Sequence, residues 1–175
     1  MRRAAQLKRL RPDLNVIQFR GNVETRLRKL DEGVATATFL AMAGLNRLGM
    51  AHVARSAIEV EEMLPAVAQG AIGIERRVAD ARVARLLARV HHGETGLRLA
   101  AERSFLATLD GSCETPIAGL AVIEGDQLWL RGEILRPDGS ASVAGERRGL
   151  VVQGAEIGRV LAEELLGRAG PGFFD

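Results

Sequence analysis

Residues 117–148, IAGLAVIEGDQLWLRGEILRPDGSASVAGERR, decide the fold of the second half of the chain. This stretch contains three strand-like segments, at residues 117–123, 127–135 and 141–148. Gly125-Asp126 separates the first two segments, and Pro137-Asp138-Gly139 separates the last two. Both are turn sequences, because glycine tolerates positive φ and proline presets φ at the first central position of a turn. The pattern therefore predicts a three-stranded antiparallel meander.

Helical patterns flank this meander on both sides. Apolar residues recur at helical spacing in residues 80–90 and 94–109 before it, and in residues 153–167 after it. In the last of these segments, the side chains expected to point inward are Ile157, Val160, Leu161 and Leu165. The second half is therefore predicted to be a small α+β domain with a three-stranded antiparallel sheet and helices.

In the first half, predicted helices and predicted strands alternate along the sequence. Residues 2–10 predict a helix that ends before Pro12, and Asn22 is expected to cap a second helix that runs to Leu30 and stops at Gly33. Two strands are expected around that second helix, at residues 15–19 and 36–43. Strand, helix and strand within about 30 residues is typical of an α/β domain. Further along, residues 64–74 are apolar and contain glycine, and they predict a loop that leads into a buried strand.

Charge is unevenly distributed along the 175 residues, although the formal net charge is only +2. Residues 1–89 hold 16 basic and 9 acidic side chains, and the first 30 residues alone hold 9 basic and 2 acidic ones. Only Lys8 and Lys29 are lysines; every other basic residue is arginine. Because the guanidinium group binds carboxylate and phosphate in a planar, bidentate way, the basic N-terminal part indicates recognition of small anionic groups.

Composition excludes several classes of protein. A single cysteine, Cys113, excludes a disulfide framework and a cysteine-rich zinc site, and no metal site is expected. No apolar run is long enough for a membrane span, and the start of the chain lacks the apolar core of a secretory signal. Tyrosine is absent and aromatic residues make up 3% of the chain, so we expect no nucleic-acid partner. A cytoplasmic protein without a membrane partner is the expectation.

Two places in the basic part could bind an anion. In Arg20-Gly21-Asn22 a predicted strand passes into a helix N-terminus, with Arg26 nearby, and backbone N–H groups there would suit an anionic group. Arg2 and Arg3 could line an anion cleft. From spacing alone, a capped helix and solvated arginines are the favoured explanation of both places. His52 and the pair His91-His92 lack acidic or cysteine partners at ligand spacing, so a surface position at a helix end is expected for the pair.

Cys113 lies in the loop sequence Gly-Ser-Cys-Glu-Thr-Pro, after a predicted helix. Most single cysteines are small buried apolar residues, but flanking glycine and serine in a loop are more compatible with a reactive or modified thiol. No base for such a thiol can be named from its neighbours in sequence.

Seven stretches of the sequence, in the same order and covering essentially the whole chain, resemble porphobilinogen deaminase (hydroxymethylbilane synthase). They are RRAAQLKRLRPDL, RGNVETRLRKLDEG, LAMAGLNRLG, LPAVAQGAIGIE, ETGLRLAAERSFLATLDGSCETPIAG and the closing PDG and AEELL segments. The resemblance implies the polymerisation of four porphobilinogen molecules into hydroxymethylbilane, with release of ammonia, in tetrapyrrole biosynthesis. It also implies a transferase that carries a dipyrromethane cofactor.

The resemblance also implies the site residues. Cys113, in GSCETPI, matches the cysteine that carries the cofactor through a thioether. By motif, the cofactor-binding arginines are Arg2, Arg3, Arg20 and Arg26, and the substrate-binding residues are Arg20, Arg26, Arg47 and Gln69. In the family, such arginines bind the acetate and propionate groups of porphobilinogen and of the oligopyrrole intermediates. Always-charged, bidentate groups suit a ligand with two carboxylates per pyrrole.

The resemblance further implies how the chain divides. Residues 1–64 would be an incomplete second domain of the family, a periplasmic-binding-protein-like α/β domain. Residues 65–90 would connect to the first domain, and residues 91–175 would be the C-terminal domain. The catalytic aspartate of the family lies in a segment that this sequence does not contain. One departure is local: the usual GQGA reads Ala68-Gln69-Gly70-Ala71 here.

Three expectations follow. This chain alone should not turn over porphobilinogen, because no motif in it supplies the acid–base carboxylate. The apolar faces of residues 65–90 and 36–43 should lack their usual cover, so association with a separate N-terminal half, self-association or partial disorder is expected. The competing interpretation is a non-catalytic anion-binding or interaction module that retains the C-terminal fold.

Overall fold

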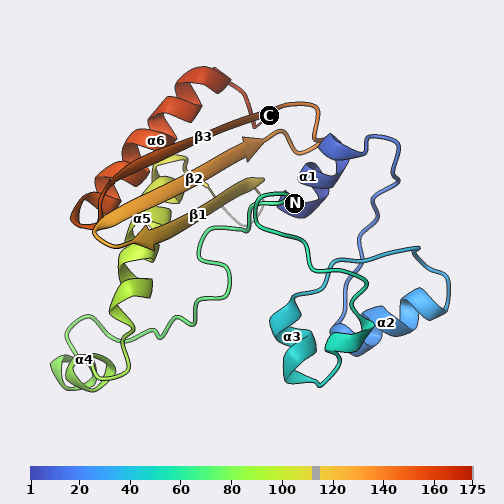
Figure 1. Ribbon diagram of the computed structural model, residues 1–175, viewed down its shortest axis with the longest axis horizontal. Helices are drawn as coiled ribbons and strands as arrows, with labels where there is room; N and C mark the ends of the chain where they lie inside the picture. The colour runs from blue at the N-terminus through green and yellow to red at the C-terminus, as the bar shows by residue number, and fades with distance from the viewer. Residues whose placement is uncertain (112–114, 175) are drawn as a thin grey trace. The chain divides into compact units, whose positions relative to one another are not determined.

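The computed structural model describes residues 1–111 and 115–174 and divides the chain into two compact units (Figure 1). The first unit contains Met1–Leu14 and Met63–Asp175, and the second contains Asn15–Glu62. The two units are described separately below.

The first unit is built on a three-stranded antiparallel sheet in the order β1-β2-β3. The strands are β1 (Ile117–Glu124), β2 (Gln127–Leu135) and β3 (Ser142–Leu150), so the predicted meander is confirmed. Both turns contain a glycine at positive φ, Gly125 at 66° and Gly139 at 79°. A side chain is disfavoured in that region of φ, which explains why glycine occupies these two turn positions.

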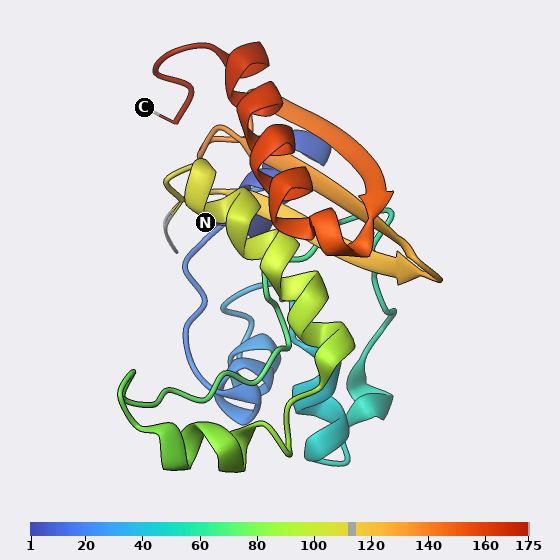
Figure 2. The same ribbon diagram turned by 90° about the vertical axis from the view of Figure 1, so that its left-hand side faces the viewer.

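Two long helices, α5 (Gly93–Thr108) and α6 (Gly154–Ala169), cover one face of this sheet (Figure 2). A short 3₁₀ helix, η2 (Val151–Gln153), joins β3 to α6. The core between the layers centres on Phe105, whose ring occupies the space where a Cβ on Gly132 would otherwise lie. The predicted α+β domain is therefore confirmed, and its apolar layer follows the predicted helix and strand periodicities.

The first unit also contains α1 (Arg2–Leu10), with the bounds that the sequence predicted, and the shorter α4 (Ala81–Leu87). Ala5 of α1 is fully buried. A Cβ on Gly139, in the β2–β3 turn, would lie 2.7 Å from the carbonyl oxygen of Ala5, so this turn packs directly against α1. The small residues at these two positions let the helix backbone approach the end of the sheet.

Residues 63–71 are held against the edge strand β1. The N–H of Gly119 donates to the carbonyl of Pro65 (3.0 Å), and Val67 packs against the core. Ala68 has a φ of 59°, a conformation that favours glycine. The resemblance places a glycine at this position, so the loop keeps a backbone shape for which alanine is less suited.

The second unit contains α2 (Val23–Asp31), α3 (Met42–Arg47) and the 3₁₀ helix η1 (Ala51–Val53). Asn22 caps α2 as predicted, because its side-chain oxygen accepts the N–H of Thr25 at 2.8 Å. A Cβ on Gly21 would lie 2.8 Å from the Thr25 side chain, and its φ is 133°. The closeness of the Thr25 side chain and the positive φ therefore both favour glycine at position 21.

Three strand predictions are wrong. Residues 15–19 and 36–43 form no strand, and α3 begins at the end of the second of these segments. Residues 64–74 also do not lead into a strand. The physical reason is that a strand exists only when a neighbour accepts and donates its backbone hydrogen bonds. Among the described residues, strands occur only in the β1–β3 sheet.

Several apolar side chains of residues 65–90 are exposed. Ile72 and Val78 are 93% and 95% exposed, and Ile74, Leu86 and Val90 are also exposed. The expectation that residues 65–90 lack apolar cover is therefore met in the structure. Among the described helices, none has the length and apolar character needed to cross a lipid bilayer.

Candidate carboxylate-binding site

Arg2 lies at the first position of α1, where its half-buried guanidinium group meets residues 63–71 of the first unit. Its Nη1 donates to the side-chain oxygen of Gln6 (2.6 Å) and to the carbonyl of Leu64, and its Nη2 donates to Oε1 of Gln69 (3.1 Å). The structure thus brings together two residues that the resemblance named, Arg2 and Gln69, across 67 positions of sequence.

The hydrogen-bond partners of Arg2 among the described residues carry no charge. Within the described part of the chain, every hydrogen-bond acceptor of Arg2 is a neutral carbonyl or amide oxygen. Its pKa is lowered from 12.5 to about 10, mainly by burial and then by the positive charge of Arg3, while the charge of Glu133 acts in the opposite direction. The group still remains protonated at neutral pH. A partly desolvated cation with only neutral partners is suited to bind an anion.

Gln69 reaches Arg2 because the loop that carries it is fixed at several points. Its Oε1 also accepts the N–H of Ala66 (3.2 Å), which closes the loop on itself. The N–H of Ala68 donates to Oε2 of Glu102 on α5 (2.7 Å), and Oε1 of the same carboxylate accepts the N–H of Ala121 in β1 (2.8 Å). Glu102 therefore joins the loop, α5 and the sheet edge.

Glu102 is buried, with 6% of its surface exposed. Desolvation raises its pKa, and the two backbone hydrogen bonds oppose that rise without cancelling it. The N–H groups of Ala68 and Ala121 both donate to this carboxylate. Glu102 therefore supports the geometry around Arg2, although it does not touch the guanidinium group.

The other predicted residues lie elsewhere. Arg3 is exposed on α1. Arg20, Arg26 and Arg47 belong to the second unit: Arg20 is exposed before α2, Arg26 donates from Nε to the carbonyl of Gly21 (2.8 Å), and Arg47 is the exposed last residue of α3. Arg20 and Arg26 thus flank the N-terminus of α2, as the sequence predicted. Cys113 lies outside the described residues.

Three polar residues at the site were missed by sequence reasoning: Gln6, Glu102 and Glu133. Gln6 could have been found, because it lies four residues after Arg2 and therefore on the same side of the helix. Glu133 stands out in sequence only as a carboxylate in an otherwise apolar strand end. No sequence pattern indicated that Glu102 would bind two backbone N–H groups.

The histidine pair behaves as expected from sequence. His92 is the N-cap of α5, where its Nδ1 accepts the N–H of Thr95 (3.3 Å) and lies 2.8 Å from the Thr95 hydroxyl oxygen. This is a structural role at a helix end.

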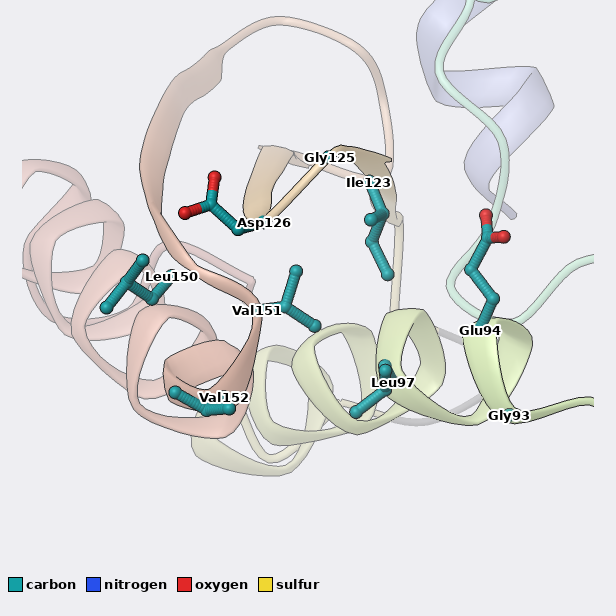
Figure 3. A pocket seen from close by; sticks show the side chains of 9 residues that line it. All are labelled: Gly93, Glu94, Leu97, Ile123, Gly125, Asp126, Leu150, Val151 and Val152. Carbon is teal, nitrogen blue, oxygen red and sulfur yellow. The ribbon is translucent and has the colours of Figure 1, made fainter.

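A separate groove of about 680 Å³ lies between the start of α5, the β1–β2 turn and η2 (Figure 3). Leu97, Ile123 and Val151 face its interior, and its charged lining residues, Glu94 and Asp126, are both acidic. It contains none of the predicted site residues. Because its lining is apolar and acidic, this groove is unsuited to a polycarboxylate.

Comparisons with known proteins give matches over most of the chain. Residues 1–85 match the family model described as "Porphobilinogen deaminase, dipyromethane cofactor binding domain", and residues 97–167 match "Porphobilinogen deaminase, C-terminal domain". The chain belongs to the porphobilinogen deaminase family. A curated porphobilinogen deaminase from Paracoccus denitrificans (strain Pd 1222) is 65% identical over all 175 residues. The chain covers 56% of that relative's length, so it spans about half of the protein it matches.

The family match groups the candidate residues. Arg2, Arg3, Arg20, Arg26, Arg47 and Gln69 all lie inside the cofactor-binding domain match. Cys113 lies inside the C-terminal domain match. The Arg2–Gln69 contact therefore lies in the part of the chain that matches the cofactor-binding domain model.

Proposed function

We propose that this chain contributes to a porphobilinogen deaminase, which joins four porphobilinogen molecules into hydroxymethylbilane and releases ammonia. The observation that carries the proposal is the half-buried Arg2 guanidinium, held by Gln6, Gln69 and the Leu64 carbonyl with no anionic partner among the described residues. This arrangement lies in a segment that matches a cofactor-binding domain of the family.

The proposed ligand of this site is the dipyrromethane cofactor together with the growing oligopyrrole. Each pyrrole carries an acetate and a propionate group, so the ligand is polyanionic. Arg2 would bind one carboxylate of the ligand through its remaining N–H groups. The family motifs imply carboxylate-binding roles for Arg3 as well and, in the second unit, for Arg20, Arg26 and Arg47. Gln69 would fix the guanidinium plane of Arg2. An arginine pairs with a carboxylate in a planar fork, which orients the ligand as well as neutralising it.

We propose that the cofactor is attached to Cys113 through a thioether. The support comes from the motif GSCETPI and from the position of the loop, which joins the end of α5 to the start of β1. When bound, the cofactor supplies the pyrrole carbon to which the next substrate unit is joined. The two elements that precede and follow this sequence, α5 and β1, are packed in the α+β core.

We also propose a division of the chain. Residues 1–64 would be part of the periplasmic-binding-protein-like α/β domain, residues 65–90 would lead to the family's first domain, and residues 91–175 would be the C-terminal domain. In support, apolar side chains of residues 65–90 such as Ile72 and Val78 are exposed. The compact units of the structure divide the chain elsewhere, because residues 1–14 group with residues 63–175. A separate N-terminal half, or a second copy of the chain, would cover these side chains. Without the acid–base aspartate of the family, the chain alone would not turn over porphobilinogen.

A calorimetric titration tests this function. The chain is titrated with a dipyrromethane that bears its acetate and propionate groups, with the corresponding ester and with glutarate. We expect saturable binding of the acid that weakens as salt is added, and no saturable binding of the ester. Equal affinity for glutarate would favour the non-catalytic anion-binding module. Absence of saturable binding for all three ligands would contradict both functions.

A further inference from the structure

Glu133 is a buried carboxylate on the face of the sheet opposite α5 and α6. Its neighbour in β2, Gly132, faces Phe105 on the helix-covered side, so the alternation of strand side chains directs Glu133 to the other side. The residue is 9% exposed. Its Oε2 accepts from Nε2 of Gln6 (3.0 Å), and its Oε1 lies 3.9 Å from Nη1 of Arg9. Glu133 therefore joins the sheet to α1.

Gln6 links Glu133 to Arg2 through hydrogen bonds. Its Nε2 donates to Glu133 and to the carbonyl of Leu64 (3.2 Å), while its Oε1 accepts from Nη1 of Arg2 (2.6 Å). A carboxylate and a carbonyl can only accept hydrogen bonds. The amide nitrogen of Gln6 must therefore face them, and the amide oxygen must face the guanidinium group. Gln6 is 5% exposed, so water does not offer alternative partners.

The neutral amide between Glu133 and Arg2 has a further consequence. A carboxylate paired directly with Arg2 would neutralise it and occupy its fork. Acting through Gln6, Glu133 orients the guanidinium group without pairing with it directly, so another anion can still bind that group. We propose that Glu133 is a positioning residue for the carboxylate site: it fixes the amide of Gln6, which holds Arg2 in its binding orientation. This inference rests on the proposed function for the identity of the ligand.

A double-mutant cycle tests the binding consequence, with the dissociation constant of the dipyrromethane acid as the readout. We expect Glu133→Ala to weaken binding about fivefold in the wild-type background and to have no effect in the Arg2→Gln background. Glu133→Gln keeps an acceptor for Gln6 and should bind within about twofold of wild type. A merely structural role would weaken binding equally in both backgrounds and would overturn the proposal, as would unchanged binding in Glu133→Ala.

A second readout needs no ligand. In the chain labelled with ¹⁵N-arginine, the Nη signals of Arg2, assigned with Arg2→Gln, report how firmly the guanidinium group is held. We expect slow rotation in wild type, faster rotation in Glu133→Ala, and no change in Arg9→Gln, which removes the other contact of Glu133. An unchanged Arg2 signal in Glu133→Ala would overturn the positioning role. If wild type binds no dipyrromethane acid but the signals change as expected, the proposed function fails and the positioning role stands.

Discussion

Replacing Glu102 by alanine is expected to lower the free energy of unfolding by about 3 kcal/mol, because two buried N–H groups, those of Ala68 and Ala121, lose their acceptor. Glu102→Gln should cost less, since the amide keeps one acceptor oxygen. Its amide nitrogen, however, would face a second donor. Urea denaturation of the three proteins measures the difference. As a control, Glu163→Ala removes an exposed carboxylate of α6 that pairs with Arg159, and it should change stability little.

The same residue predicts a pH dependence. Burial raises the pKa of Glu102 in the folded chain, so the folded state binds this proton more tightly than the unfolded state does. The contribution of Glu102 to stability should therefore fall as the pH rises from about the ordinary carboxyl pKa through the raised one. Glu102→Gln should lack this fall. A difference between the two proteins that does not vary with pH would contradict the raised pKa.

Replacing Arg2 by glutamine is expected to weaken binding of the dipyrromethane acid about thirtyfold, because a charge-assisted contact to a carboxylate is lost from a partly desolvated position. Arg2→Lys should recover only part of the affinity, since an ammonium group cannot form the planar fork. Calorimetric titration measures both. The matched control is Arg159→Gln on α6, whose guanidinium group is exposed and paired with Glu156 and Glu163. If Arg2→Gln binds as tightly as wild type, Arg2 is not part of the site.

Local sequence patterns correctly predicted the elements that form within one short segment or between segments that are neighbours in the sequence. The bounds of α1, the Asn22 cap and the three-stranded meander all follow from helix periodicity, capping chemistry and turn residues close together in sequence. The strands expected at residues 15–19 and 36–43 did not form, because β-propensity acts only where a partner strand is available.

The candidate site could be predicted only in part, for a similar reason. The resemblance named Arg2 and Gln69, and the structure places them 3.1 Å apart. The residues that fix them in place are remote in sequence: Glu133 reaches Gln6 across 127 positions, and Glu102 reaches Ala68 across 34. Such contacts depend on how α1 and residues 63–71 pack against the sheet, and no local pattern encodes that packing.

We propose that this chain holds a dipyrromethane on Cys113 with its carboxylates bound by arginine. The intact mass of the purified chain after incubation with preassembled cofactor tests this proposal. We expect a gain equal to one dipyrromethane unit and a positive Ehrlich colour, both absent in Cys113→Ala. An unchanged mass in the wild-type chain, or an equal gain in Cys113→Ala, would contradict it.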